Sequence, residues 1–123
     1  MSKKKILAVD DELEVLTLLE KRLSSAGYDV VTATNGKEAV ELAKRERPAL
    51  IVLDILMPGM DGSETAAVLH DDPNTKDIPI LFLTCLFTKR EEQFEGHEVG
   101  HNFFIAKPYD PADLLTEITK IIG

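Results

Sequence analysis

The segment ALIVLDILMPGMDG, residues 49–62, contains the feature on which the fold depends. Five apolar residues, Ala49 to Leu53, lead directly into Asp54, and three more apolar residues follow it. Such a nearly continuous apolar run is typical of a strand that is covered on both faces of a parallel sheet. Burying a carboxylate without a partner costs free energy. The segment therefore predicts a central strand that ends in an acid, and other parts of the chain must supply the groups that balance Asp54.

Around this segment, short β-branched runs alternate with longer amphipathic runs along the whole chain. The apolar spacing predicts strands at residues 4–10, 28–33, 49–54, 79–84 and 102–106. It predicts helices at residues 12–26, 36–46, 62–71, 88–99 and 111–122. This alternation indicates a single α/β domain over residues 1–123, with a mostly parallel sheet, right-handed crossovers and helices on both faces.

Capping signals agree with these boundaries. Gly27 is expected to end the first helix, and Pro48 should prevent the second from continuing beyond Arg47. Asn35, followed three residues later by Glu38, predicts a capping box at the start of the second helix. The apolar face of the first helix is expected to consist of Leu16, Leu19 and Leu23. Later capping signals are the pairs Asp61 with Glu64, Thr88 with Glu91, and Asp110 with Pro111.

The composition of the chain argues against several classes of protein. With 44% apolar and 29% charged residues among 123, the chain is expected to form an ordinary globular domain. A formal net charge of −8 argues against binding to nucleic acid or anionic lipid. No apolar run reaches the roughly 18 residues of a membrane span, and the run near the N-terminus is too short for a signal peptide. Cys85 has no second cysteine to pair with, which favours the reducing cytoplasm.

Chemically active side chains follow the predicted strands at the point where each strand ends. They are Asp10 and Asp11 after the first strand, Asp54 at the third, Thr84 at the fourth and Lys107 at the fifth. Ligands of open parallel sheets bind beyond the carboxyl ends of the strands. Carboxylates gathered at one edge repel one another, and the single ammonium group of Lys107 offsets only one charge. The remaining charge favours a hard divalent cation, and oxygen ligands without His or Cys favour Mg²⁺.

Each of these residues also has an ordinary structural explanation. Asp10 or Asp11 could cap the first helix, and a lone aspartate at a strand end is commonly a turn or cap residue. Thr84 could be a simple strand former, and Lys107 a solvated surface charge. The occurrence of the whole set at one predicted edge favours a functional site over packing alone.

The motifs ILAVDDE, LIVLDILMPGMDG, ILFLT and AKPY, in this order, resemble the receiver domain of bacterial two-component response regulators. The resemblance extends from Lys4 to the final predicted helix. It implies a flavodoxin-like (βα)5 fold, which is a doubly wound five-stranded parallel sheet with strand order 2-1-3-4-5. It also implies a signalling phosphoacceptor rather than an enzyme, because such a domain catalyses only its own phosphorylation and dephosphorylation.

The resemblance assigns the chemistry of the site to particular residues. Asp54 matches the phosphoacceptor, which takes a phosphoryl group from a histidine kinase or a phosphotransfer domain. Asp11 matches a direct ligand of Mg²⁺ (or Mn²⁺), Asp10 matches a ligand that acts through water, and the backbone carbonyl of Leu56 matches a further ligand. Together with Asp54, these groups form the implied metal site, and no other cofactor is expected.

The resemblance also implies a conformational switch. Lys107 matches the lysine that pairs with the phosphoryl group, and Thr84 matches the hydroxyl that moves toward it. Phe104 would then fill the vacated space, although core packing explains a Phe in an apolar strand equally well. The chain would be a monomer or a phosphorylation-dependent dimer. The implied surface for dimerisation, for a downstream protein or for a fused output domain consists of residues 88–99, 102–106 and 111–122.

Several positions depart from the usual residues of the family. Phe104 stands where Tyr is common, and Cys85 stands where a smaller residue is common. A buried small hydrophobe explains Cys85 more simply than restricted access to the site. Leu56 and Leu86 each lie two residues beyond a site residue, and their apolar side chains cannot orient a water molecule. We therefore expect a long-lived phosphorylated form.

Three alternative functions fit the sequence less well. A flavodoxin-like cofactor binder would need a Ser/Thr/Gly-rich phosphate loop after the first strand, where VDDELE would repel phosphate. A haloacid-dehalogenase-like phosphatase would carry its nucleophile in a D-x-D motif, whereas Asp10 and Asp11 are adjacent. A pseudo-receiver that acts only as an interaction module would usually have lost part of the acid, hydroxyl and lysine set.

Overall fold

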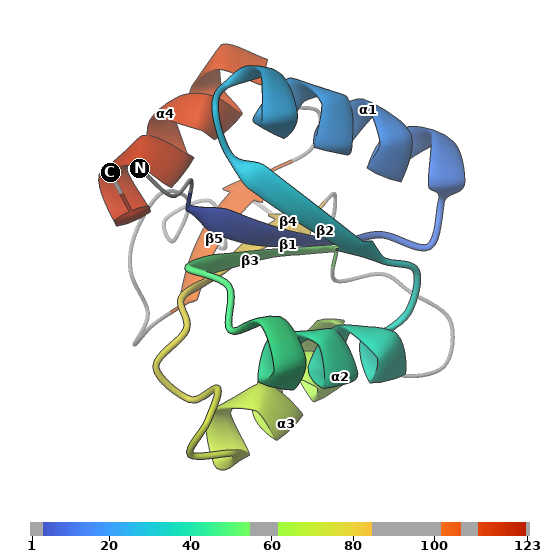
Figure 1. Cartoon of the computed structure of the whole chain (residues 1–123), viewed down its shortest axis with the longest axis vertical. Helices are drawn as coiled ribbons and strands as arrows, with labels where there is room; N and C mark the ends of the chain where they lie inside the picture. The colour runs from blue at the N-terminus through green and yellow to red at the C-terminus, as the bar shows by residue number, and fades with distance from the viewer. Residues whose placement is uncertain (1–3, 55–61, 85–101, 107–110, 123) are drawn as a thin grey trace.

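The computed structural model describes residues 4–54, 62–84, 102–106 and 111–122, which form a parallel five-stranded sheet with helices on both faces (Figure 1). The strands are β1 (Lys5–Val9), β2 (Asp29–Ala33), β3 (Leu50–Asp54), β4 (Ile80–Thr84) and β5 (Asn102–Ala106). The helices are α1 (Leu13–Ser25), α2 (Gly36–Glu46), α3 (Gly62–Asp71) and α4 (Pro111–Ile122). The strand order is β2-β1-β3-β4-β5, and every adjacent pair is parallel. The predicted fold class and strand order are therefore confirmed.

The observed helices and strands lie close to the positions expected from the sequence, with ends that differ by no more than one residue. The predicted helix at residues 88–99 lies outside the described residues, as do the predicted caps Asp61, Thr88 and Asp110. In the part of the chain that the structure describes, no helix is both long enough and apolar enough to cross a bilayer.

Two hydrophobic layers hold the helices on the sheet, because side chains alternate between the two faces along each strand. Helices α1 and α4 cover one face, and α2 and α3 cover the other (Figure 1). The first layer joins Ile6 and Ala8 of β1 to Leu16, Leu19 and Leu23 of α1 and to Leu114 and Ile118 of α4. The second layer joins Leu7 and Val9 of β1 to Ala39 and Ala43 of α2 and to Ala66 and Leu69 of α3. The apolar face predicted for the first helix is therefore confirmed.

Strand β3 lies in the interior of the sheet between β1 and β4. The side chains of Leu50, Ile51, Val52 and Leu53 are at most 1% exposed. Fully burying an aliphatic side chain stabilises a fold by about 1.5–3 kcal/mol relative to leaving it exposed. Strand β3 is thus a firmly packed support for the acid at its carboxyl end.

The ends of helices α1 and α2 are fixed by capping residues and by residues with positive φ. Asn35 Oδ1 accepts a hydrogen bond from the N–H of Glu38 at 2.8 Å, which confirms the predicted cap. The Glu38 carboxylate accepts from the N–H of Thr34 at 3.0 Å, one residue before the partner that a capping box would use. Arg47 adopts a left-handed conformation with φ of 46° and ends α2. Gly27 has φ of 100° directly after α1, a conformation that costs glycine little.

Ion pairs join α2 to the start of β1 and to the turn after α3. Lys5 Nζ lies 2.7 Å from Glu46 Oε1, and Arg45 Nε lies 3.2 Å from Glu46 Oε2. The hydrogen bond from Lys5, followed by that from Arg45, lowers the pKa of Glu46, and the same bond to Glu46 raises the pKa of Lys5. Lys44 Nζ lies 3.2 Å from Asp72 Oδ2 after α3. These contacts neutralise charge at the edge of the sheet opposite to the candidate site.

We predict that replacing Glu46 by Gln lowers the stability of the protein at neutral pH and that this difference disappears in acid. The folded-state pKa of Glu46 lies below its ordinary value of 4.5, so its contribution is present above that pH and is lost as the pH falls through the folded-state pKa. Urea unfolding at neutral pH and at acid pH below the folded-state pKa measures the difference.

The matched control is Glu41→Gln, which removes the same charge from an exposed position on the same helix. The control should change stability little at either pH. An effect of Glu46→Gln that is equally large at both pH values would contradict the role given to the ion pair.

Candidate metal centre

Adjacent strands bring two acids to the same level at the carboxyl edge of the sheet. Strands β1 and β3 pair in parallel, with Val9 opposite Leu53. Asp10 and Asp54 each come next along their strands, and Asp11 follows Asp10. One carboxylate oxygen from each of these three aspartates lies within 4.8 Å of the others. Residues that are distant in the sequence therefore form one acidic cluster, Asp10, Asp11 and Asp54.

The acidic cluster is largely withdrawn from solvent. Asp10 is 1% exposed and Asp54 is 7% exposed, whereas Asp11 is an exposed residue. Two unit charges between 4 and 5 Å apart repel each other by roughly 3–4 kcal/mol at an effective dielectric constant of 20. Since burial limits the screening of this repulsion by water, the cluster favours the binding of a cation.

The chemistry of the donors fits a hard divalent cation. All three donors in the acidic cluster are carboxylate oxygens, which Mg²⁺ and Ca²⁺ prefer over nitrogen or sulfur. Oxygens on opposite sides of a bound Mg²⁺ are about 4 Å apart, because each lies about 2 Å from the ion. The observed separation of at most 4.8 Å therefore requires only a small movement of the side chains.

Backbone hydrogen bonds fix Asp10 in this position. The N–H of Asp10 donates to the carbonyl of Ala33 at 3.2 Å, and Asp10 Oδ1 accepts from the N–H of Glu12 at 2.9 Å. The capping position of α1 is occupied by Glu12, whose side chain makes no capping hydrogen bond. Neither Asp10 nor Asp11 is thus the N-cap of this helix, and the structure does not support helix capping as the explanation for the pair.

The remaining predicted site residues are described only partly. Thr84 is the last residue of β4, in the strand next to β3, and its backbone therefore ends at the same edge of the sheet. Phe104 lies within β5, where it pairs with Phe82. Lys107 and the carbonyl of Leu56 lie outside the described residues. For these four residues, the assigned roles stay predictions.

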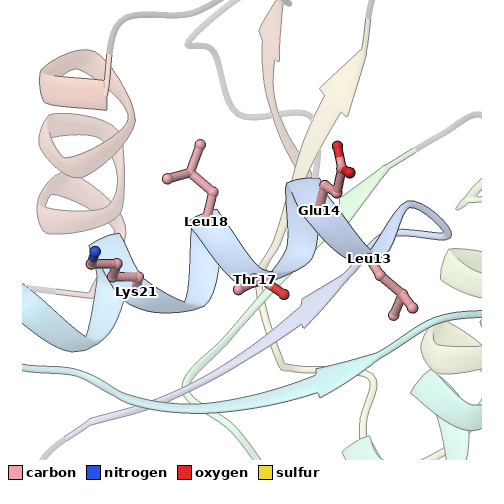
Figure 2. Close-up of a pocket in the computed structure, with 5 residues that line it drawn as sticks. All are labelled: Leu13, Glu14, Thr17, Leu18 and Lys21. Atoms are coloured by element: carbon pink, nitrogen blue, oxygen red, sulfur yellow. The ribbon is translucent and has the colours of Figure 1, made fainter.

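The outer face of α1 has an apolar character that the sequence analysis did not identify. Leu13 is 66% exposed and Leu18 is 50% exposed. They line a shallow surface hollow together with Glu14, Thr17 and Lys21 (Figure 2). Part of the signal was present in the sequence, because Leu18 lies outside the helical spacing of the buried leucines, whereas Leu13, three residues before Leu16, keeps that spacing. This hollow begins two residues after Asp11 and is therefore close to the acidic cluster along the chain.

Comparison with known families identifies similarity over nearly the whole chain. The family model for the response regulator receiver domain matches residues 6–119. The probable transcriptional regulator ycf27 of Porphyridium aerugineum is 40% identical over 122 residues, which are 99% of this chain and 49% of that protein. The chain thus spans about half the length of this relative.

Solved structures with the same fold include receiver domains. The chemotaxis protein CheY4 of Vibrio cholerae has a TM-score of 0.85 and 34% identity, with 98% of this chain and 99% of that chain covered. The receiver domain of the sensor histidine kinase PA1611 from Pseudomonas aeruginosa PAO1 has a TM-score of 0.83 and 29% identity, with 99% of both chains covered. That structure has a magnesium ion coordinated in its active site cleft.

We predict that Asp11→Asn stabilises the metal-free protein, because it removes one of three mutually repelling charges. After allowance for solvent screening at this exposed position, the gain should be roughly 1 kcal/mol. Urea unfolding in the presence of a chelator measures it.

The control is Asp71→Asn, which removes an exposed aspartate at the far end of α3 and should change stability by less than about 0.5 kcal/mol. Loss of stability in Asp11→Asn would show that other groups already balance the acidic cluster, and would argue against a strong demand for a cation.

Proposed function

This chain belongs to the family of response regulator receiver domains, and we propose that it accepts a phosphoryl group on Asp54 in a reaction that depends on Mg²⁺. The observation that carries the proposal is the acidic cluster, whose three carboxylate oxygens lie within 4.8 Å of one another. A pseudo-receiver that only binds partners would not require three repelling acids at this edge.

The position of Asp54 supports its role as the acceptor. It is the last residue of β3, a strand whose other side chains are almost completely buried. The residue is 7% exposed, so its surroundings hold it in place while it keeps a small contact with solvent. Fixed geometry matters here, because phosphoryl transfer is catalysed mainly by positioning and by neutralisation of charge.

The proposed metal site uses the acidic cluster. Asp11 and Asp54 would bind Mg²⁺ (or Mn²⁺) directly, Asp10 would act through a water molecule, and the backbone carbonyl of Leu56 would complete the protein ligands. The bound ion supplies positive charge that neutralises the phosphoryl oxygens. This assignment agrees with the oxygen-only donors and with the acidic character of the edge.

The proposed reaction transfers a phosphoryl group from a phosphohistidine of a histidine kinase or phosphotransfer domain. A carboxylate oxygen of Asp54 attacks the phosphorus, the P–N bond breaks, and the histidine nitrogen retains the electron pair. An acyl phosphate forms on Asp54. In the proposed arrangement, Lys107 pairs with the phosphoryl oxygens. The domain thus catalyses its own phosphorylation and dephosphorylation and has no separate substrate to turn over.

We place the approach of the phosphodonor over the acidic edge and the adjoining hollow of α1. A donor must bring its histidine to Asp54, and therefore must cover the edge from which α1 begins. Leu13 and Leu18, both at least half exposed, offer apolar contact area there. Larger exposed apolar patches rimmed by polar residues mark protein interaction sites, and Glu14 and Lys21 lie beside these two leucines.

The signal would leave the domain through a charge-driven switch. The phosphoryl group adds negative charge at Asp54, draws the Thr84 hydroxyl toward it and lets Phe104 change position. The responding surface would consist of residues 88–99, β5 and α4, and would contact a downstream protein, a fused output domain or a second copy. A cytoplasmic location, favoured by the unpaired Cys85, is part of the proposal.

We predict that incubation with acetyl phosphate and Mg²⁺ increases the intact mass by one phosphoryl group. The increase should be absent in Asp54→Asn and when a chelator removes the metal, and it should persist in the control Asp71→Asn. Intact-protein mass spectrometry measures all four samples. Equal phosphorylation of the wild type and Asp54→Asn would refute the acceptor assignment.

We also predict that Leu56→Asn shortens the lifetime of the phosphorylated protein. An amide two residues beyond the acceptor can orient a water molecule for attack on phosphorus, whereas leucine cannot. Decay of the phosphorylated mass after removal of acetyl phosphate should be faster by roughly tenfold. Leu56→Met, which keeps the position apolar, is the control. Identical decay in the wild type and Leu56→Asn would contradict the prediction.

A further inference from the structure

We propose that Asn35 and Glu38, at the start of α2, are positioning residues that hold Asp10 in place and thereby set the affinity of the acidic cluster for a divalent cation. The proposal rests on the proposed function, because it takes the acidic cluster to be the metal site. It adds Asn35 and Glu38, which lie outside the acidic cluster and would not themselves bind the cation.

The first link joins Asp10 to the edge strand of the sheet. Val9 pairs with Ala33 at the end of the ladder between β1 and β2. The N–H of Asp10 then donates to the carbonyl of Ala33 at 3.2 Å. The end of β2 is therefore one support of the Asp10 backbone, beside the bond from Glu12 to its side chain and the pairing of β1 with β3. Because β2 is an edge strand with β1 as its neighbour in the sheet, another element must hold that end.

The second link joins the end of β2 to α2. The residue after Ala33 is Thr34, whose N–H donates to Glu38 Oε1 at 3.0 Å. Asn35 Oδ1 accepts from the N–H of Glu38 at 2.8 Å, and its carbonyl accepts from the N–H of Ala39 at 3.0 Å. Residues 34 and 35 are thus held by three hydrogen bonds to the first turn of α2.

The third link anchors α2 itself. Ala39, Val9 and Ala33 belong to the same buried layer, and Gly36 is also buried. The helix therefore forms a packed support, and the hydrogen bonds transmit its position through Thr34 and Ala33 to Asp10. The bond from Thr34 to Glu38 thus fixes the residue next to Ala33.

A shift of the Asp10 backbone would also move its carboxylate within the metal site, because the residue is 1% exposed and its side chain has little space to compensate. Ligand groups must be held to within about 0.5 Å for strong binding. Outer residues that bond directly to ligands typically change metal affinity by about 10–100-fold when removed. Asp10 is itself proposed to act through a water molecule, and the exposed residues Asn35 and Glu38 reach it only through the end of β2. Removing either side chain should therefore have a smaller effect and weaken Mg²⁺ binding by roughly threefold.

The test compares Mg²⁺ affinities by titration calorimetry for the wild type, Asn35→Ala, Glu38→Ala and Glu38→Gln. Thermal unfolding establishes that each variant is folded at the titration temperature. Glu38→Gln keeps an oxygen that accepts from Thr34, and should therefore bind Mg²⁺ with an affinity within about twofold of the wild type. Asn35→Ala and Glu38→Ala should show the predicted loss. The controls Glu41→Ala and Glu41→Gln change the same charge at an exposed position of the same helix, and should bind as the wild type.

Amide resonances of Asp10 and Thr34 give a second readout that does not depend on metal. Both should shift, and exchange faster with solvent, in Glu38→Ala but not in Glu38→Gln or Glu41→Ala. Equal weakening in Glu38→Gln and Glu38→Ala would show that charge alone matters, and would overturn the proposal. Wild-type affinity in Asn35→Ala and Glu38→Ala would also overturn it. Failure of the wild type to bind Mg²⁺ and to be phosphorylated would instead refute the proposed function.

Discussion

Repulsion between carboxylates at the ends of paired parallel strands is the constraint on which the other features of this protein depend. Strands β1 and β3 lie side by side, so the acids at their carboxyl ends meet at one edge of the sheet. Both Asp10 and Asp54 are buried there. Buried like charges cost free energy that the packing of the two strands must offset. In the proposed function, a bound cation and a phosphoryl group would change this balance of charge, which suits the edge to a reversible signal.

The two edges of the sheet differ in how their charged side chains are arranged. Near the amino edge, Lys5 pairs with Glu46 and Lys44 pairs with Asp72. At the carboxyl edge, the acidic cluster concentrates negative charge within a few ångströms. The partly exposed ion pairs contribute modestly to stability, whereas the acids at the other edge remain close together and favour a cation. The repulsion within the acidic cluster lowers stability locally, as is common at functional sites.

Much of the fold and part of the site could be predicted from the sequence, because the signals are local. The apolar run before Asp54 predicted the buried strand, and Asn35 caps α2 as expected. The partner of the Glu38 carboxylate was predicted incorrectly, because the backbone N–H that it reaches depends on the conformation of the turn after β2. The exposed apolar face around Leu13 and Leu18 was also missed, since a leucine on a helix is ordinarily assigned to the core.

By itself, the sequence determined which residue types follow the strands, because helices and strands impose different spacings on apolar residues and thus reveal where each strand ends. It also determined that oxygen donors, rather than nitrogen or sulfur, stand at those positions. Only the tertiary structure decided that the donors meet within 4.8 Å, and that Asp10 is held by Ala33 and Glu12 without being the cap of α1. The physical reason is that these distances arise from pairing between strands and from hydrogen bonds between turns that are far apart in the chain, which local spacing does not encode.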